Sequence, residues 1–334
     1  MGAAYTKPAE IPSKHFAAFS ANLPSLAGKT IAVTGSTTGT GFIAALTCAS
    51  KGAHVVLLNR PSERVTAAMK QIQEKVPGCT LTSIPCDLSS FESVRAAGAA
   101  LREKFAETGL DVLCNNAGVM ALADVATVDG YDVQMQTNHL SHFLLSKEVF
   151  PLLEKAAELR GEARIVHHSS GARKFPSSPL SAENLGKNGG ALGGDSASML
   201  CGGARWQRYH QTKLANSVCT LALRDRLAAR HPKILALCAA PGLAATNLQV
   251  TTAEKGGMSE TWIMRFAQSA EDGCMPLLTC VAGAGVKSGE LYEPAGMTGP
   301  AVRVNLDAEA ITANPVSREI LWTESEKACG VWGL

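Results

Sequence analysis

The sequence predicts an α/β fold: a single doubly wound sheet of seven parallel strands with helices on both faces. Short apolar runs rich in β-branched residues alternate along the chain with longer stretches of helical periodicity. The run His54–Asn59 reads VVLL at its centre, which is typical of a strand buried on both faces. Because strands that alternate with helices imply βαβ crossovers, we expect a parallel sheet. The 334 residues, 46% of them hydrophobic, suffice for one large core.

Each expected element is placed by its own pattern. Apolar, strand-length runs predict strands at residues 29–34, 54–59, 81–86, 111–114, 163–167, 234–239 and 290–292. Apolar residues recurring at helical spacing predict helices at residues 41–49, 62–76, 91–107, 130–160, 206–229 and 259–285. The segment 176–205 breaks this alternation with repeated glycine pairs, so we expect a functional or mobile loop there.

The chain is expected to divide into three parts. Residues 1–27 contain prolines and show no clean periodicity, so they are interpreted as an arm ahead of the fold. Residues 28–293 form the main domain, with the glycine-rich insert 176–205 inside it. Residues 294–334 show little periodicity and are expected to be a tail packed on the domain or on a partner, which leaves a homo-oligomer open.

The composition argues against several classes of function. The formal net charge is +2 and no basic stripe occurs, so no nucleic-acid partner is expected. No apolar run is long enough to span a membrane and no secretory leader is indicated, so we expect a cytoplasmic protein. The ten cysteines form no CxxC pair and are interpreted as buried free thiols in a reducing compartment. His139 and His142, like the adjacent pair at 167–168, lack further ligands at metal spacing, so no metal site is expected.

The first expected strand runs into a turn with the pattern TGxxxGxG at residues 34–41. Glycines in such a turn let the backbone approach a pyrophosphate, which the free N–H groups of the next helix then hold. The pattern lies between an expected strand and an expected helix, as this mechanism requires. It therefore predicts a bound dinucleotide.

The second expected strand ends in Asn59-Arg60. An acidic residue at this place would accept hydrogen bonds from the adenosine ribose and repel a 2′-phosphate. Here no acid is present and an arginine follows, which favours NADP over NAD.

Tyr209 and Lys213 lie four residues apart in an expected helix and therefore project from the same face. The unperturbed pKa of tyrosine is about 10, too high for base chemistry at neutral pH. A neighbouring ammonium favours the phenolate and lowers that pKa, and a positively charged nicotinamide ring would lower it further. The pair predicts proton transfer to or from a substrate oxygen.

Taken together, these motifs resemble the short-chain dehydrogenase/reductase family. They occur in the family's order: the turn at 34–41, Asp87, Asn115, Asn116, Ala117, Gly118, Asn138, Ser170, Tyr209, Lys213, Pro241 and Gly242. The match spans about residues 28–293. Residues 213–216 and Arg60 are most similar to the retinol-dehydrogenase-like and protochlorophyllide-reductase-like branches, which act with NADP on bulky lipophilic substrates. The resemblance implies a Rossmann-type domain and an oxidoreductase that interconverts a carbonyl and an alcohol on a lipophilic small molecule.

The resemblance also implies residue roles. Tyr209 would donate or remove the proton, and Lys213 would lower its pKa and hold the nicotinamide ribose. Ser170 would hydrogen-bond the substrate oxygen, with Ser169 as the rival because a one-residue shift points to the other strand face. Asn138 would help to hold a water relay behind Lys213. The residues expected to bind NADP are Gly35, Ser36, Thr38, Gly39, Gly41, Asn59, Arg60, Asp87, Leu88, Asn116, Ala117, Gly118, Tyr209, Lys213, Pro241, Gly242 and Thr246.

Within that set, Asp87 would contact the adenine and Thr246 the nicotinamide carboxamide. Thr38 stands where many NADP enzymes place a basic residue, so Arg60 carries the NADP preference. The insert 176–205 and the segment after Gly242 are expected to form a lid over a hydrophobic substrate, or to pack on the sheet or a second subunit. The apolar residues of the second lid segment are Leu248, Met258, Trp262, Ile263, Met264 and Phe266.

Two alternatives remain for the function. One is a relative of the sugar-nucleotide epimerases or dehydratases, which tend to show a TGxxGxxG turn and a larger C-terminal lobe. The other is a non-catalytic NADP-binding scaffold or sensor. A scaffold has no chemical need for all four of the expected catalytic residues.

Overall fold

The computed structural model describes residues 11–176, 178–199, 202–258 and 261–334. Its centre is one sheet in the strand order β3-β2-β1-β4-β5-β6-β7-β8. The strands are β1 (Thr30–Thr34), β2 (His54–Asn59), β3 (Leu81–Pro85), β4 (Val112–Asn115), β5 (Ala163–His168), β6 (Ile234–Ala239), β7 (Leu291–Pro294) and β8 (Ala301–Val304). The α/β fold and all seven expected strands are confirmed, and these seven pair in parallel.

The eighth strand, β8, was not predicted. It pairs antiparallel with β7 at the edge of the sheet, inside the segment interpreted as an irregular tail. An edge strand of four residues, AVRV, is too short to show a clear alternation of apolar and polar residues.

The described helices are α1 (Phe16–Ala21), α2 (Gly39–Ser50), α3 (Glu63–Lys75), α4 (Phe91–Phe105), α5 (Val133–Met135), α6 (Ser141–Arg160), α7 (Ala182–Leu185), α8 (Ala204–Arg230), α9 (Asn247–Glu254), α10 (Ala270–Ala282) and α11 (Pro315–Cys329). A π-helical turn (Gln136–Leu140) joins α5 to α6, so the helix expected at 130–160 starts later than predicted. The helix expected at 259–285 is α10 preceded by a 3-10 turn (Thr261–Phe266), because Ser269 caps a new helix there.

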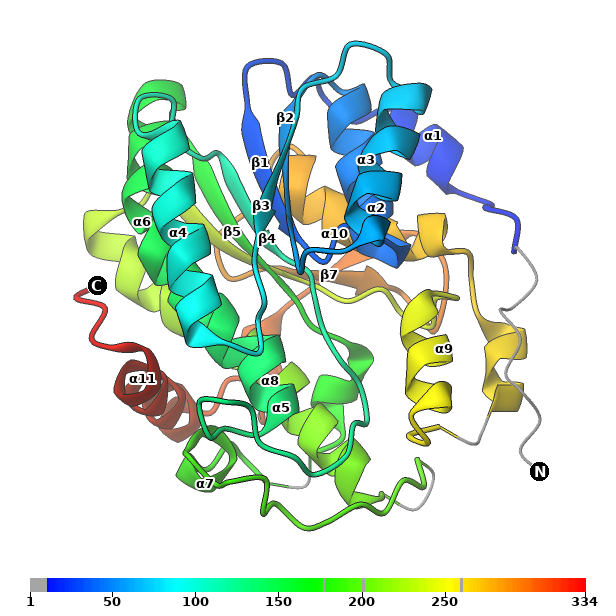
Figure 1. The fold of residues 1–334 in the computed structure, drawn as a ribbon, viewed down its shortest axis with the longest axis vertical. Helices are drawn as coiled ribbons and strands as arrows, with labels where there is room; N and C mark the ends of the chain where they lie inside the picture. The colour runs from blue at the N-terminus through cyan, green and yellow to red at the C-terminus, as the bar shows by residue number, and fades with distance from the viewer. Residues whose placement is uncertain (1–10, 177, 200–201, 259–260) are drawn as a thin grey trace.

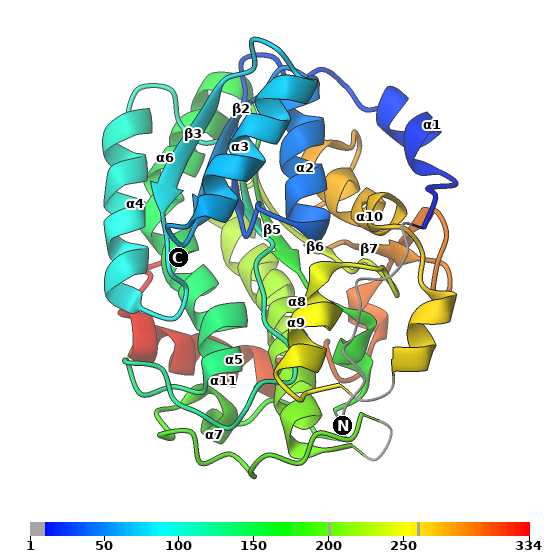
Figure 2. The ribbon, with the colours of Figure 1, turned by 45° about the vertical axis from the view of Figure 1, so that its right-hand side comes forward.

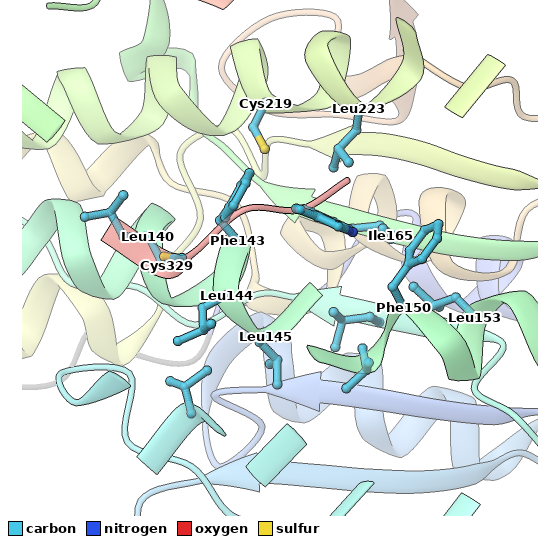
Figure 3. Packing of buried hydrophobic residues seen from close by; sticks show 14 of the residues in the cluster. Leu140, Phe143, Leu144, Leu145, Phe150, Leu153, Ile165, Cys219, Leu223 and Cys329 are labelled. Carbon is cyan, nitrogen blue, oxygen red and sulfur yellow. The ribbon is translucent and has the colours of Figure 1, made fainter. Parts of the chain in front are cut away.

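Helices cover both faces of the sheet (Figure 1). One layer contains α4, α6, α8 and α11, and the other contains α2, α3 and α10. In the first layer Phe143 and Phe150 of α6 pack among Ile165 of β5 and Leu223 of α8 (Figure 3). The Phe143 ring also meets Trp332, near the C-terminus, at 5.1 Å. The segment after β7 therefore adds a strand to the sheet and a helix to the core.

The segment 11–27 lies against α10. The Asp272 carboxylate, in the first turn of α10, accepts hydrogen bonds from the Ser13 hydroxyl and from the backbone N–H groups of Lys14, His15 and Phe16, at 2.8–3.0 Å. Across the described part of the chain, no helix combines the length and the apolar character needed to cross a membrane.

The strand order reverses between β1 and β4, because the chain moves outward from β1 to β3 and then returns to the other side of β1. In open parallel sheets ligands bind outside the carboxyl ends of the strands at such a reversal. This geometry places the turn after β1 and the segment after β4 at the same edge.

Candidate active site

A cleft of about 1990 Å³ lies along the carboxyl edge of the sheet. Arg60 and Asp87, which follow β2 and β3, line it at one end of the strand order. Ser170 and Gly242, which follow β5 and β6, line it toward the other end. The cleft is therefore lined by residues from each strand end at which a functional motif was expected from the sequence.

The turn after β1 fits the pyrophosphate of a dinucleotide. Gly35 has φ +67°, and a Cβ atom there would lie 2.8 Å from the Cβ of Ala117, so no side chain fits. Thr38 occupies the N-cap of α2 but its side chain makes no capping hydrogen bond. The first N–H groups of this helix can therefore bind an anion.

Ser36 and Asn59 support this turn. The Ser36 N–H donates to Asn59 Oδ1 at 2.9 Å, and Asn59 Nδ2 donates to the Ser36 hydroxyl at 2.8 Å. Both side chains are buried, and Ser36 does not line the cleft. Arg60 is exposed and lines the cleft together with Arg64, which the sequence analysis missed.

Asn116 holds three segments together beneath the same turn. Its Nδ2 donates to the Thr34 carbonyl at 2.9 Å, and its Oδ1 lies 3.1 Å from the Thr40 hydroxyl and 2.9 Å from His168 Nδ1. Thr246 lines the cleft, but its hydroxyl takes part in the capping box of α9. Asn116 and Thr246 therefore shape the backbone beside the cleft.

At the other end of the cleft, α8 carries Tyr209 and Lys213 on one face. Lys213 Nζ lies 5.7 Å from the centre of the Tyr209 ring and donates a hydrogen bond to the His168 carbonyl at 2.9 Å. Ser170, which follows β5, lines the cleft together with Tyr209, and its side chain acts on Tyr209 in the direction that lowers the pKa of the phenol. The adjacent Ser169 is buried, and its hydroxyl donates to the Lys213 carbonyl at 2.7 Å. Of the two serines, Ser169 uses its hydroxyl inside the core, whereas Ser170 is the one that influences the pKa of Tyr209.

Comparison with known proteins gives the same family. A family model described as short chain dehydrogenase matches residues 29–183. A short-chain dehydrogenase/reductase of Penicillium roqueforti is 30% identical over 259 residues, which are 76% of this chain and 70% of the relative. The chain belongs to the short-chain dehydrogenase/reductase family. The expectation from its motifs is confirmed.

Two further relatives and two solved structures agree with this assignment. An uncharacterized oxidoreductase of Schizosaccharomyces pombe is 37% identical over 209 residues, which cover 62% of this chain and 58% of the relative. Human retinol dehydrogenase 13 is 37% identical over 143 residues, which cover 43% of this chain and 41% of the relative. These two matches span only about two fifths to three fifths of the relatives' own lengths.

Among solved structures, an uncharacterized protein of Mycobacterium paratuberculosis superimposes with a TM-score of 0.71 at 28% identity, covering 94% of this chain and 98% of that one. L-sorbose reductase of Gluconobacter frateurii, solved with NADPH and L-sorbose, gives a TM-score of 0.60 at 22% identity, covering 82% and 97%. The second likeness shows the fold alone.

Burial sets the pKa values of the two central residues in this short-chain dehydrogenase/reductase. Burial raises the pKa of Tyr209 to about 12, and the hydrogen bond from Ser170 opposes this rise. Burial lowers the pKa of Lys213 to about 8. The net shift of the Tyr209 pKa is therefore upward, opposite to the lowering expected from Lys213, because burial dominates it.

Asn138 lies behind the cleft, in the π-helical turn Gln136–Leu140. Its Oδ1 accepts a hydrogen bond from the Val119 N–H at 2.8 Å, and its Nδ2 donates to the Thr212 hydroxyl at 2.9 Å. The Thr212 hydroxyl donates in turn to the Tyr209 carbonyl at 2.8 Å. Thr212 thus connects Asn138 to the turn of α8 that carries Tyr209.

An apolar cluster surrounds the Tyr209 ring. It contains Met120, Ala121, Trp206, Met258 and Met264, with Met199, Leu243 and Leu248 packed against it. Met258, Met264 and Leu248 were expected to cover the site, whereas Met120, Met199 and Trp206 were missed because loops and helix ends carry no apolar periodicity. Phe266 is 61% exposed, and the side chains of Trp262 and Ile263 lie outside the described part of the structure.

The four central histidines are buried and neutral. Burial lowers the pKa of His139, His167 and His168 to about 3 and that of His142 to about 4. Each hydrogen-bonds to an uncharged oxygen; the partners are Ser325 for His139, Thr34 for His142, Thr220 for His167 and Asn116 for His168. They act as packing and hydrogen-bonding residues of the core.

Proposed function

We propose that this chain is an NADP-dependent oxidoreductase that interconverts a carbonyl and an alcohol on a lipophilic small molecule. The observation that carries the proposal is the meeting of Tyr209, Ser170 and Lys213 at one end of the cleft. A hydroxyl that can give up a proton, a second hydroxyl beside it and a lysine behind them are the groups that proton transfer to a substrate oxygen needs.

NADP is the cofactor that the other end of the cleft favours. The turn after β1 and the uncapped start of α2 would hold the pyrophosphate, and the exposed Arg60 would pair with the 2′-phosphate. When bound there, NADPH would supply the hydride.

The protein's own residues would move the proton. In reduction the Tyr209 hydroxyl donates to the carbonyl oxygen while the Ser170 hydroxyl hydrogen-bonds the same oxygen; in alcohol oxidation Tyr209 accepts the proton instead. Because the pKa of Lys213 is about 8, its ammonium is able to return a proton toward Tyr209 near neutral pH. Asn138 and Thr212 would hold this part of α8 in place.

The apolar cluster around Tyr209 supports a lipophilic substrate. Methionine side chains are flexible and polarizable, so three of them beside one ring suit an irregular apolar molecule. Likeness to a retinol dehydrogenase over part of the chain is consistent with this substrate class. Cytoplasmic location is also part of the proposal, supported by the free thiols of the nine described cysteines.

Tyr209→Phe tests the proposal. The variant keeps the ring and removes the transferable proton, so NADPH-dependent reduction of a carbonyl panel should fall by about 10²–10⁴-fold. Titration calorimetry should show nearly unchanged NADPH affinity. Tyr131→Phe is the matched control, because Tyr131 is a buried tyrosine that does not line the cleft. A wild-type protein that binds NADPH but turns over no carbonyl or alcohol would instead indicate the non-catalytic scaffold.

A further inference from the structure

Arg208 directly precedes Tyr209 on α8, and its side chain is only 3% exposed. Within the described part of the chain, its hydrogen bonds go to loop carbonyls. Nη1 donates to Leu192 at 3.2 Å and to Gly194 at 2.8 Å, and Nη2 donates to Leu122 at 3.2 Å. Leu192 and Gly194 belong to the glycine-rich insert, and Leu122 to the loop that follows β4. One side chain therefore ties two distant loops to the helix that carries Tyr209.

The same two loops also bind each other through Asp124. Its Oδ2 accepts hydrogen bonds from the N–H groups of Leu192 and Gly194, at 2.9 and 2.8 Å, and lies 3.6 Å from Arg208 Nη1. The Asp124 N–H donates to Asp195 Oδ1 at 2.7 Å. Two backbone N–H groups of the insert therefore bind the Asp124 carboxylate, and the Arg208 guanidinium lies next to the same carboxylate.

A third segment joins at Trp206. The indole N–H donates to the Ala197 carbonyl in the insert and to the Gly257 carbonyl after α9, both at 3.0 Å. The Trp206 ring meets the Tyr209 ring edge-on at 5.9 Å. Figure 2 shows α9 beside α8, with the chain of the insert crossing beneath them. The first two turns of α8 therefore hold both segments that were expected to form a lid.

The inner side chains of these segments form the wall of the cleft near Tyr209. They are Met120, Leu122, Leu192, Met199, Trp206 and Met258. Ala121, between two of them, has φ +47° and is the one non-glycine residue with positive φ in the described part of the chain. Such a conformation persists only where the surroundings fix it, and it occurs preferentially in ligand sites.

The choice of partners distinguishes Arg208 from an arginine that only neutralises buried acids. Asp132 Oδ2 lies 3.4 Å from Arg208 Nε, yet both atoms lack a hydrogen bond. A guanidinium placed to pair with a carboxylate forms two parallel hydrogen bonds with it. This one directs its hydrogen bonds to the loop carbonyls and leaves the carboxylates at longer range.

We propose that Arg208 is a positioning residue that sets the shape of the substrate pocket and thereby its preference for long apolar carbonyl compounds. It holds the insert and the loop after β4 at a fixed distance from Tyr209, so that the apolar wall closes over the substrate chain. The proposal rests on the proposed function, because it names the substrate class of the same site.

The test compares Arg208→Met with wild type on aliphatic aldehydes from propanal to dodecanal. The wild type should prefer the long aldehydes. In Arg208→Met the ratio of kcat/KM for dodecanal to that for propanal should fall about tenfold, mainly through the KM of the long aldehyde. NADPH affinity should stay within about twofold of wild type. Arg226→Met is the matched control, because Arg226 lies on α8 over the Trp322 ring and outside the cleft. An unchanged aldehyde profile in a folded Arg208→Met would overturn the proposal.

Two milder variants keep the test decisive if Arg208→Met does not fold. Arg208→Lys keeps the positive charge but loses the planar set of guanidinium N–H donors. Asp124→Asn removes the carboxylate that accepts hydrogen bonds from the insert. Hydrogen exchange at residues 192–194 should be faster in both than in wild type, by about tenfold, while Arg226→Lys leaves it unchanged. Equal exchange in all four proteins would refute the role of Arg208.

The exchange measurement needs no turnover. If the proposed function fails, the wild type reduces no aldehyde, yet the exchange result still decides whether Arg208 holds the insert.

Discussion

Two buried arginines stand beside the expected catalytic residues, and they are held in opposite ways. Arg173 follows Ser170 by three residues and uses all five of its N–H groups: four donate to Glu293 and Glu309, and one donates to the Ser170 carbonyl. Among the described residues, Arg208 donates to loop carbonyls alone, while its nearest carboxylate oxygens lie 3.4–3.9 Å away.

The difference indicates that Arg173 supports the fold, whereas Arg208 supports the substrate pocket. Glu293 belongs to β7 and Glu309 to the segment after β8, so Arg173 connects the Ser170 turn to the edge of the sheet by charge-assisted hydrogen bonds. The connections of Arg208 are neutral carbonyls on loops, which are individually weaker. We call Arg173 with Glu293 and Glu309 the Arg173 cluster, and Arg208 with its loop carbonyls and neighbouring carboxylates the Arg208 cluster. We therefore expect the Arg173 cluster to matter most for stability and the Arg208 cluster to matter most for substrate preference.

The largest effect is expected from Arg173→Met. Removing the guanidinium leaves two carboxylates without their buried partner, which should reduce the free energy of unfolding by about 3–5 kcal/mol. Arg208→Met loses hydrogen bonds to carbonyls and should cost about 1–3 kcal/mol. Urea unfolding at pH 7 measures both. Equal losses in the free energy of unfolding would show that the two arginines contribute alike to stability.

The two clusters should also respond to pH with opposite signs. Burial raises the pKa of Asp132 from 3.8 to about 6, although hydrogen bonds from backbone N–H groups and the charge of Arg208 oppose this rise. Burial acts in the same direction on Glu293, but hydrogen bonds and charge from Arg173 and Lys174 outweigh it and hold the pKa of Glu293 below its usual range.

For Asp132 the protonated form is favoured in the folded state, so its stabilising contribution is complete below its unfolded pKa and is lost as pH rises through about 6. For Glu293 the contribution is present above its unfolded pKa and is lost as pH falls through the lower folded value. Asp132→Asn should therefore flatten a decline in stability between about pH 4 and 6, of at most about 1.4 kcal/mol per pH unit. Glu293→Gln should flatten the loss on the acid side. Urea unfolding at a series of pH values checks both. If the free energy of unfolding depends on pH in the same way in the two variants, Asp132 and Glu293 do not act with opposite signs.

The smallest effect on the protein itself is expected at a third arginine, the exposed Arg60. Arg60→Ala should leave the free energy of unfolding within about 0.5 kcal/mol of wild type. NADPH affinity should weaken about tenfold because a charge-assisted contact to the 2′-phosphate is lost, and NADH affinity should stay the same. Titration calorimetry with both cofactors is the measurement. Arg64→Ala is the companion variant, because Arg64 lines the same end of the cleft. If only Arg64→Ala weakens NADPH, the NADP preference belongs to Arg64.

The local part of the site was predictable from the sequence. The turn at 34–41, the strand ends and the pair Tyr209 and Lys213 depend on backbone geometry and helical spacing, which the chain encodes over a few residues. The structure brings these motifs to one cleft because parallel strands all end at the same edge. The direction of the pKa shift at Tyr209 was not predictable, because it depends on how deeply the assembled fold buries both groups.

The α/β class, the seven parallel strands and the motifs at their carboxyl ends could therefore be read from the amino-acid sequence, because hydrophobic periodicity and turn chemistry are local properties. The antiparallel edge strand β8, the burial of the Ser169 hydroxyl against Lys213 and the positions of Arg173 and Arg208 became apparent only in the folded chain. Their partners are remote in the sequence: Glu309 is 136 residues from Arg173, and Leu122 is 86 residues from Arg208. Contacts over such distances are selected by packing of the whole chain, and no local pattern records them.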